Sequence, residues 1–194
     1  HAEGANVALL DADSYGPSKI SRLGSKERPR SPDQQTMLPI YAHGLQTMSI
    51  GYLIDENEPM IWRGPMVIQA LHQLLTQTRW ENVDYLIIDL PPGTGDTQLS
   101  MALNVPVAGS LIVTTPQDIA LLDAKKGLRM FQKVNVPILG IVENMSMFCC
   151  PQCGHNTAIF GEAGGEKMSA EFGVPLLGRL PLAPQIRADA DRGM

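Results

Sequence analysis

The sequence predicts an α/β fold in which a mostly parallel sheet is flanked by helices, and two observations carry this prediction. Several short apolar runs stop abruptly at polar residues and a turn, as residues 7–10, 84–90 and 137–142 do. Segments with the helical spacing of apolar residues alternate with these runs. Near-continuous apolar runs are typical of strands covered on both faces, and their alternation with helices is typical of parallel sheets with right-handed crossovers.

In the first half of the chain, local residue chemistry supports each expected element. Apolar runs on either side of a His43–Gly44 turn indicate two short strands, at residues 37–41 and 45–50. A helix is expected over residues 65–78 because Pro65 suits the first turn, where its missing N–H is not needed.

In the second half, one long helix is expected to run from Pro116 to about residue 134. Its residues Ile119, Leu122, Leu128 and Phe131 recur at helical spacing and are expected to face the sheet. The other expected elements are strands at residues 7–10, 84–90, 109–115, 137–142 and 176–180, and helices at 98–103 and within 161–172.

Composition bounds the class of protein. The chain has 194 residues, of which 44% are apolar, so residues 1–194 are most simply one domain. A net charge of −5 without a basic cluster predicts no nucleic-acid partner. No apolar run reaches the roughly 20 residues that span a bilayer, which predicts no membrane partner. Three cysteines, two of them adjacent, do not form a secreted disulfide framework, so we expect a cytoplasmic protein.

Carboxylates follow two of the apolar runs. Asp89 ends one run and is followed by a turn that contains two prolines and Gly93, and Asp11 and Asp13 follow the other run. In phosphate-binding α/β proteins such a carboxylate holds Mg²⁺, and the glycines let backbone N–H groups approach a terminal phosphate. Ligands of parallel sheets bind at the carboxyl ends of the strands. The pattern favours a nucleotide site, and the alternative is an ordinary acidic strand end before a turn.

Asn144 follows a third expected strand, at residues 137–142. Because an amide offers both donors and an acceptor, it can bind a base edge in a way that a carboxylate cannot. The alternative is that Asn144 only forms a turn, and this alternative is favoured when the residue is considered by itself.

The cysteines suggest half of a metal site. Cys150 and Cys153 have the C-x-x-C spacing that lets two thiolates bind one metal, in a loop expected at residues 147–156. A tetrahedral thiolate centre needs four ligands, so two chains related by a two-fold axis would complete it. The alternatives are a redox dithiol, an intrachain zinc site that uses Cys149 or His155, and incidental thiols in a loop.

Six stretches, in order, resemble the Mrp/ApbC family of P-loop ATPases, which are iron–sulfur cluster carriers related to MinD and the nitrogenase iron protein. The stretches are residues 10–18, 61–66, 89–96, 142–146, 150–155 and 178–182. The resemblance covers essentially the whole chain and implies the SIMIBI-class P-loop NTPase fold.

The same resemblance implies roles for individual residues. Asp13 would be the switch carboxylate near the γ-phosphate and the attacking water, and Asp89 would be the carboxylate on the Mg²⁺ side. Gly93, Asn144 and Pro181 would contact ATP, with Asn144 at the adenine.

The function implied by the resemblance is ATP-dependent transfer of a [4Fe–4S] cluster to apo iron–sulfur proteins, with slow ATP hydrolysis as a switch. Cys150 and Cys153 would bind the cluster between the two chains of a homodimer. The other functions considered are a non-catalytic dimeric scaffold held by zinc and a MinD-like regulatory ATPase. The family's glycine-rich phosphate loop with its lysines has no counterpart in these 194 residues. We therefore expect a chain truncated at both ends, whose intact form is the ATPase and which by itself binds ATP weakly or not at all.

Overall fold

The computed structural model describes residues 2–13, 27–53, 64–93 and 95–193. Parts of the family-like stretches at residues 10–18, 61–66 and 89–96 therefore lie outside the described residues. The chain divides into two compact units: unit 1 comprises residues 1–92 and 186–194, and unit 2 comprises residues 93–185. Each unit has a sheet of its own, and a single domain over residues 1–194 stays a prediction.

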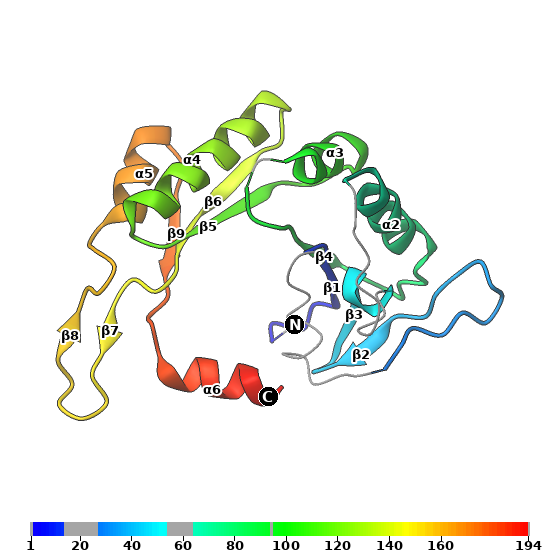
Figure 1. The fold of residues 1–194 in the computed structure, drawn as a ribbon, viewed down its shortest axis with the longest axis horizontal. Coiled ribbons are helices and arrows are strands. Elements are labelled where there is room, and N and C mark those ends of the chain that lie inside the picture. Colours follow the sequence, from blue (N-terminus) through cyan, green and yellow to red (C-terminus); the bar gives the residue numbers. More distant parts are fainter. Residues whose placement is uncertain (1, 14–26, 54–63, 94, 194) are drawn as a thin grey trace. The chain divides into compact units, whose positions relative to one another are not determined.

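Unit 1 contains a four-stranded sheet with strand order β2-β3-β1-β4 (Figure 1). The strands β1, β3 and β4 run parallel, and β2 pairs antiparallel with β3. The elements of the unit are β1 (Val7–Asp11), β2 (Ile40–Ala42), β3 (Leu45–Ser49), the 3-10 helix η1 (Ile50–Leu53), α2 (Gly64–Gln77), β4 (Tyr85–Asp89) and most of α6 (Pro184–Arg192).

The β2–β3 hairpin turns at His43 and Gly44, as the sequence predicts. Both residues have a positive φ, 50° at His43 and 76° at Gly44. A two-residue turn of this hand matches the right-handed twist of the flanking strands, and glycine adopts it without steric cost. The predicted helix at 65–78 is also present as α2, which buries Val67, Leu71 and Leu74 along one stripe.

Unit 2 contains a parallel three-stranded sheet with strand order β5-β6-β9 and a separate antiparallel hairpin, β7–β8. Its elements are α3 (Asp96–Asn104), β5 (Ser110–Thr114), α4 (Asp118–Lys133), β6 (Ile138–Glu143), β7 (Phe148–Cys149), β8 (Asn156–Thr157), α5 (Gly164–Phe172) and β9 (Leu176–Arg179). Parallel strands alternating with helices confirm the predicted α/β class in both units.

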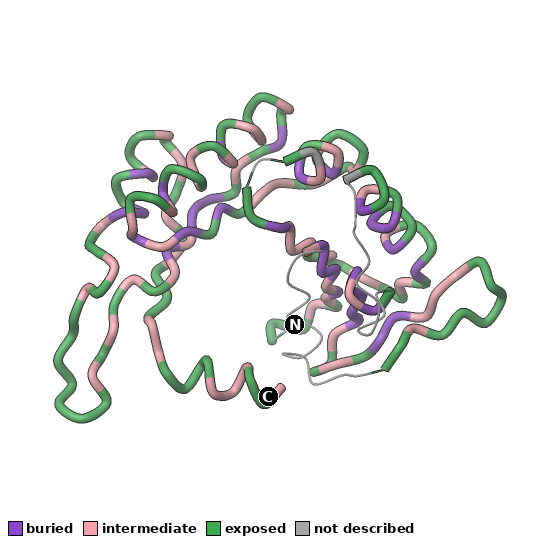
Figure 2. The backbone as a smooth tube through the Cα atoms, viewed as in Figure 1, coloured by how far each residue is buried: buried purple, intermediate pink, exposed green. Residues whose placement is uncertain are grey.

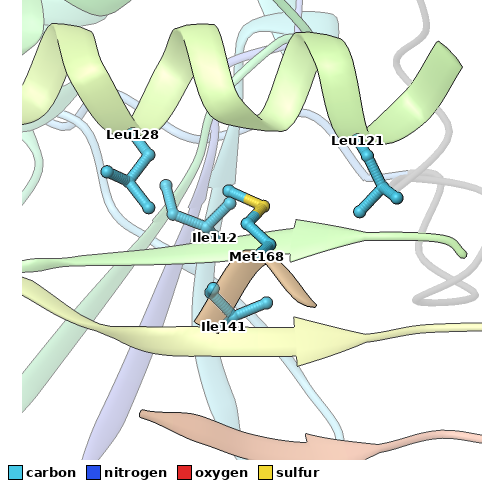
Figure 3. Packing of buried hydrophobic residues seen from close by; sticks show 5 residues of the cluster. All are labelled: Ile112, Leu121, Leu128, Ile141 and Met168. Carbon is cyan, nitrogen blue, oxygen red and sulfur yellow. The ribbon is translucent and has the colours of Figure 1, made fainter. Parts of the chain in front are cut away.

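The core of unit 2 lies between its sheet and the helices α4 and α5 (Figure 3). Ile112 of β5 and Ile141 of β6 pack against Leu121 and Leu128 of α4, and Met168 of α5 completes the cluster. Full burial of a side chain of this size contributes about 1.5–3 kcal/mol. This packing therefore holds the carboxyl ends of β5 and β6 in place.

The buried face of α4 differs from the predicted one. Leu128 faces the core, and Phe131 packs against it partly buried, both as expected. Ile119 and Leu122, however, are 70% and 53% exposed, and Leu121 is buried instead. The prediction for Ile119 and Leu122 is therefore wrong. The first two turns of α4 carry apolar residues on more than one face, and only the position of the sheet decides which face is covered.

The strands β4 and β5 are not covered on both faces within their own units. Tyr85 and Ile87 of β4 are 63% and 48% exposed, and Leu111 and Val113 of β5 are 51% and 62% exposed. Each strand lies at the end of its sheet, and among the described residues it pairs with one neighbour, β1 or β6. Since successive side chains of a strand point to opposite faces, alternate residues remain exposed. This finding corrects the expectation of strands buried on both faces.

The sequence did not predict the 3-10 helix η1, the short hairpin β7–β8 at residues 148–157, or α6. Strands of two residues are too short to show a periodic pattern. The start of α6 does carry a signal, because proline is common at the first position of a helix and Pro184 occupies it. No helix in the described part of the chain is both long and apolar enough to cross a membrane.

Candidate nucleotide and metal sites

The carboxyl ends of β1 and β4 bring two carboxylates together in unit 1. Asp11 and Asp89 are register partners at the last positions of these parallel strands. The backbone N–H of Ala12 donates to the carbonyl oxygen of Asp89 at 2.9 Å and joins the two strand ends. Mg²⁺ prefers carboxylate oxygens as ligands, so this pair fits the cation side of a nucleotide site.

Asp11 is the buried carboxylate of this group, with 1% of its surface exposed. Its Oδ2 accepts a hydrogen bond from the Ser49 hydroxyl at 2.9 Å, and its Oδ1 accepts one from the backbone N–H of Asp13 at 3.2 Å. Burial of a carboxylate is costly unless it is hydrogen-bonded, and these bonds hold the residues that lead to Asp13. The predicted site residues omitted Asp11, although two acids spaced D-x-D at a strand end could have revealed it.

The predicted residues Asp13 and Asp89 are both partly buried at this edge of the sheet. Gly93 follows Asp89 by four residues and has a φ of 99°, with open space around its Cα. A Cβ at this position would meet no other atom within 4 Å, but the positive φ would strain the backbone of any other residue. The backbone conformation, and not a lack of space, therefore requires glycine. The positive φ of Gly93 agrees with a turn whose backbone could approach a phosphate. The roles of Asp13, Asp89 and Gly93 stay predictions.

In unit 2, the structure places Asn144 and Pro181 on adjacent segments. Leu180, the residue before Pro181, donates its backbone N–H to the carbonyl oxygen of Glu143 at 2.8 Å. Its own carbonyl oxygen accepts the backbone N–H of Ser146 at 3.0 Å. The two predicted ATP contacts therefore lie beside each other, beyond the carboxyl ends of β6 and β9, where ligands of parallel sheets bind.

The Asn144 side chain is already oriented by the backbone. Its Oδ1 accepts the N–H of Met145 at 2.9 Å, and Met145 has a φ of 54°. The backbone N–H of Asn144 donates to the carbonyl oxygen of Thr114, at the end of β5, at 2.7 Å. This bond orients the amide, whose Nδ2 group can donate to an acceptor on a base edge.

Glu143 supports this end of unit 2 from within. It is 2% exposed, and its Oε2 accepts the backbone N–H of Gly165 in the first turn of α5 at 2.5 Å. A carboxylate at a helix N-terminus is also favoured by the helix dipole. Arg179 lies 3.5 Å from the other carboxylate oxygen and pairs with Glu166 at the surface. The predicted site residues did not include Glu143, whose signal is an acid that ends an apolar run.

Cys150 and Cys153 lie in the turn of the β7–β8 hairpin (Figure 1). The backbone N–H of Cys150 donates to the carbonyl oxygen of His155 at 2.9 Å, and the N–H of Gly154 donates to the carbonyl oxygen of Cys150 at 2.9 Å. Gly154 has a φ of 71°, in the left-handed region that favours glycine. The C-x-x-C-G sequence thus closes a tight turn that holds both thiols.

The turn also changes the chemistry of one thiol. The backbone N–H groups of Cys153 and Gln152 donate to the Cys150 sulfur and lower the pKa of that thiol, with a smaller contribution from the Cys153 side chain. Such donors stabilise the thiolate, which is the form that binds metals. Cys149 instead places its Sγ 3.7 Å from the carbonyl oxygen of Gly154.

Among the described residues, the cysteine pair has no third ligand of its own. Within the ranges that the structure describes, no three His, Cys, Asp or Glu side chains come together as a metal site. Cys149 and Cys153 are exposed and Cys150 is partly exposed, and Figure 2 shows the hairpin exposed over most of its length. The thiols are thus accessible to a ligand or to a second molecule.

Comparison with known proteins identifies the family. A family model described as the NUBPL iron-transfer P-loop NTPase matches residues 1–194. The chain belongs to this family. The resemblance to the Mrp/ApbC carriers inferred from six motifs is thereby confirmed.

Curated members of the iron-transfer P-loop NTPase family are similar to nearly all of this chain. An iron–sulfur cluster carrier protein of Pseudomonas fragi is 58% identical over 193 residues, which cover 98% of this chain and 67% of that protein. The carrier protein of Escherichia coli K12 is 56% identical, with 99% and 52% covered, and the mouse iron–sulfur cluster transfer protein NUBPL is 48% identical, with 96% and 59% covered. The chain thus spans about half to two thirds of the length of these relatives.

Solved structures confirm the P-loop NTPase fold. A nucleotide-binding protein of Archaeoglobus fulgidus in complex with ADP is 31% identical, with a TM-score of 0.84 over 99% of this chain and 75% of that one. The cell division ATPase MinD of Pyrococcus furiosus is 19% identical, with a TM-score of 0.66 over 100% of this chain and 77% of that one. At that identity, the second likeness supports the fold alone.

Proposed function

We propose that the protein is a cytoplasmic, ATP-dependent carrier that binds a [4Fe–4S] cluster at Cys150 and Cys153 and transfers it to apo iron–sulfur proteins. The observation that carries this proposal is a pair of thiols, one exposed and one partly exposed, held in a hydrogen-bonded turn and without a third ligand among the described residues. A site open on one side suits cargo that must be released. The names of the curated relatives, iron–sulfur cluster carrier or transfer proteins, support the same function.

The number of ligands determines the assembly. A [4Fe–4S] cluster takes four thiolates, and one chain offers the pair Cys150 and Cys153. A homodimer with one cluster between two such pairs supplies all four, and each chain donates the same residues across a two-fold axis. Release of the cluster then requires that the dimer contact loosens.

The strand ends of unit 1 would supply the nucleotide switch. Asp11 and Asp89 would hold Mg²⁺, which supplies positive charge to the phosphates of ATP when bound. Asp13 would orient the attacking water at the γ-phosphate, so that slow hydrolysis acts as a switch. The A. fulgidus neighbour is a complex with ADP, which supports nucleotide binding.

Three further residues are proposed to contact ATP. Asn144 would contact the adenine and Pro181 would contact ATP beside it, since hydrogen bonds hold their segments side by side. Gly93 would let backbone N–H groups approach the phosphates, because its positive φ turns the chain without a side chain.

The decisive experiment is metal and sulfide analysis of the full-length gene product purified without oxygen, together with its visible absorption spectrum. We expect about four iron atoms and four sulfides per two chains, with a Cys153→Ser variant as the cluster-free control. Zinc without iron or sulfide would overturn the carrier function and support the alternative, a zinc-stapled scaffold.

A further inference from the structure

Three polar side chains form one row across the carboxyl edge of the sheet in unit 1, called here the strand-end row. Asp11 of β1 is the register partner of Ser49 on β3 and of Asp89 on β4. Because these strands run parallel, register partners point to the same face of the sheet. The row therefore places a hydroxyl on one side of the Asp11 carboxylate and a second carboxylate on the other.

The direction of the Ser49 hydroxyl is fixed by its two partners. The backbone N–H of Gly51 donates to Ser49 Oγ at 3.0 Å, and Ser49 Oγ lies 2.9 Å from Asp11 Oδ2. A hydroxyl has one proton, and an ionised carboxylate can only accept a hydrogen bond. The proton of Ser49 therefore points to Asp11, and the 3-10 helix η1, which contains Gly51, holds the hydroxyl in this orientation.

This side of the row is shielded from water. Ser49 is 2% exposed and Asp11 is 1% exposed. Burial also raises the pKa of the Tyr52 hydroxyl on η1, and the charge of the Asp11 carboxylate raises it further. Hydrogen bonds in such surroundings are stronger than in water, so solvent competes little for the Oδ2 atom of Asp11.

The Asp11 carboxylate needs a fixed partner because Asp89 is its neighbour in the row. Two neighbouring carboxylates repel each other until a cation lies between them. Without the bond from Ser49, Asp11 would be free to turn away from Asp89 in the cation-free state. Mg²⁺ demands near-octahedral geometry, so its binding would then have to restore the position of the carboxylate at a cost in affinity.

We infer that Ser49 is a positioning residue of the magnesium site, whose hydroxyl holds the Asp11 carboxylate in the orientation that binds Mg²⁺ together with Asp89. This inference rests on the proposed function, in which these two acids hold the cation. Ser49 contacts neither the cation nor the nucleotide and acts through Asp11. Hydrogen-bond partners of metal ligands typically contribute about 10–100-fold to metal affinity, which sets the size of the expected effect.

The test measures how much Mg²⁺ the protein needs in order to bind a nucleotide. In the full-length gene product, calorimetry gives the affinity for the non-hydrolysable ATP analogue AMP-PNP in EDTA and at increasing Mg²⁺ concentrations. The Mg²⁺ requirement is the concentration that gives half of the gain in affinity. Ser49→Ala is expected to raise this requirement at least about tenfold and to leave the affinity in EDTA nearly unchanged. Ser49→Thr keeps the hydroxyl and should restore most of the wild-type value.

Thr47→Val is the matched control. Thr47 lies on the same strand and the same face as Ser49, is 1% exposed, and donates its hydroxyl to the carbonyl oxygen of Ile40 at 2.9 Å. The substitution removes a buried hydroxyl whose bond does not involve Asp11, so the Mg²⁺ requirement should not change. Denaturant unfolding of both variants measures the stability that each loses.

A double variant shows whether Ser49 acts through Asp11. Asp11→Asn removes the negative charge at the centre of the row and should raise the Mg²⁺ requirement by itself. Adding Ser49→Ala to Asp11→Asn should then change the requirement little further, because the effects of two residues that act as one unit do not add.

The outcomes distinguish this inference from the function on which it rests. The positioning role is overturned, and the magnesium site stands, if Asp11→Asn raises the Mg²⁺ requirement but Ser49→Ala does not. The same holds if Ser49→Ala weakens binding equally in EDTA, if Thr47→Val has the same effect, or if the two effects add in the double variant. If Asp11→Asn leaves the requirement unchanged, or Mg²⁺ does not improve binding to the wild type, the proposed magnesium site is overturned together with the role of Ser49.

Discussion

The carboxylates at the ends of β1 and β4 and the thiols of the β7–β8 hairpin are built in opposite ways. Asp11 is 1% exposed, lies in register with Asp89 and accepts hydrogen bonds from Ser49 and Asp13. Cys150 and Cys153 lie in an exposed turn between two strands of two residues each. Groups from distant parts of unit 1 fix the carboxylates, whereas residues of the turn itself hold the thiols.

This difference matches two kinds of chemistry. A buried, hydrogen-bonded carboxylate has one position, which suits a site that must orient phosphate and water accurately. An exposed pair of thiols can exchange ligands with a second chain or a recipient, which suits transient binding of cargo. The four predictions below test this contrast, from the largest expected effect to the smallest.

Loss of one thiol should abolish cluster binding. We expect Cys150→Ser and Cys153→Ser each to lose essentially all cluster iron and the cluster-dependent dimer, because a serine hydroxyl is a poor substitute for a thiolate ligand. Cys149→Ser should keep both. Iron content and sedimentation after anaerobic reconstitution measure the three variants. Equal loss in Cys149→Ser would show that the site lies within one chain.

On the carboxylate side, Asp13→Ala should reduce ATP turnover of the full-length gene product by about 10²-fold or more, because its proposed role is to orient water at the γ-phosphate. Nucleotide affinity should change much less. Steady-state turnover and calorimetry measure the two effects, with the surface substitution Asp123→Ala as a control. A loss of affinity as large as the loss of turnover would contradict the assigned role.

Removal of the buried carboxylate in unit 2 should affect stability. Glu143→Ala leaves the Gly165 N–H without its acceptor and is expected to cost about 1–3 kcal/mol in the free energy of unfolding. Glu143→Gln keeps an acceptor and should cost less. The control is Glu166→Ala, which removes the exposed partner of Arg179 and should change stability by about 0.5 kcal/mol or less. Denaturant unfolding measures the free energy of unfolding of each variant. Equal losses in Glu143→Ala and Glu166→Ala would show that the buried hydrogen bond of Glu143 contributes nothing to stability.

The smallest effect is expected at an exposed carboxylate. Backbone N–H groups of Thr36 and Gln35, the Thr36 hydroxyl and Arg79 all donate to Asp33 and hold its pKa well below the ordinary value of 3.8. A lowered folded-state pKa stabilises the fold above the unfolded pKa, and the contribution is lost as the pH falls below it.

Asp33→Asn should therefore lower the melting temperature slightly near neutral pH, and the difference from the wild type should shrink as the pH falls below about 3.8. Thermal melts across this range measure the difference, with Asp123→Asn, at a more exposed carboxylate, as the control. If the difference in melting temperature between Asp33→Asn and the wild type grew as the pH fell, the hydrogen bonds to Asp33 would not stabilise its ionised form.

The sequence by itself determined the features that depend on neighbouring residues. Apolar runs that end at Asp89 and Glu143, the turn at His43–Gly44 and the C-x-x-C-G spacing all act over a few positions. The strands of the two larger sheets, the β2–β3 hairpin and the thiol pair could therefore be predicted. The same short motifs were sufficient to place the chain in its family.

The tertiary structure alone decided which residues are buried and what they contact. Asp11 and Ser49 are 38 residues apart, and Glu143 and Gly165 are 22 apart, so neither hydrogen bond leaves a local pattern in the sequence. The covered face of α4 was mispredicted for the same reason, because Leu121 and Ile119 are equally apolar until the sheet lies against one of them. Burial is decided by the position of residues that are distant in the chain, which periodicity and turn chemistry do not encode.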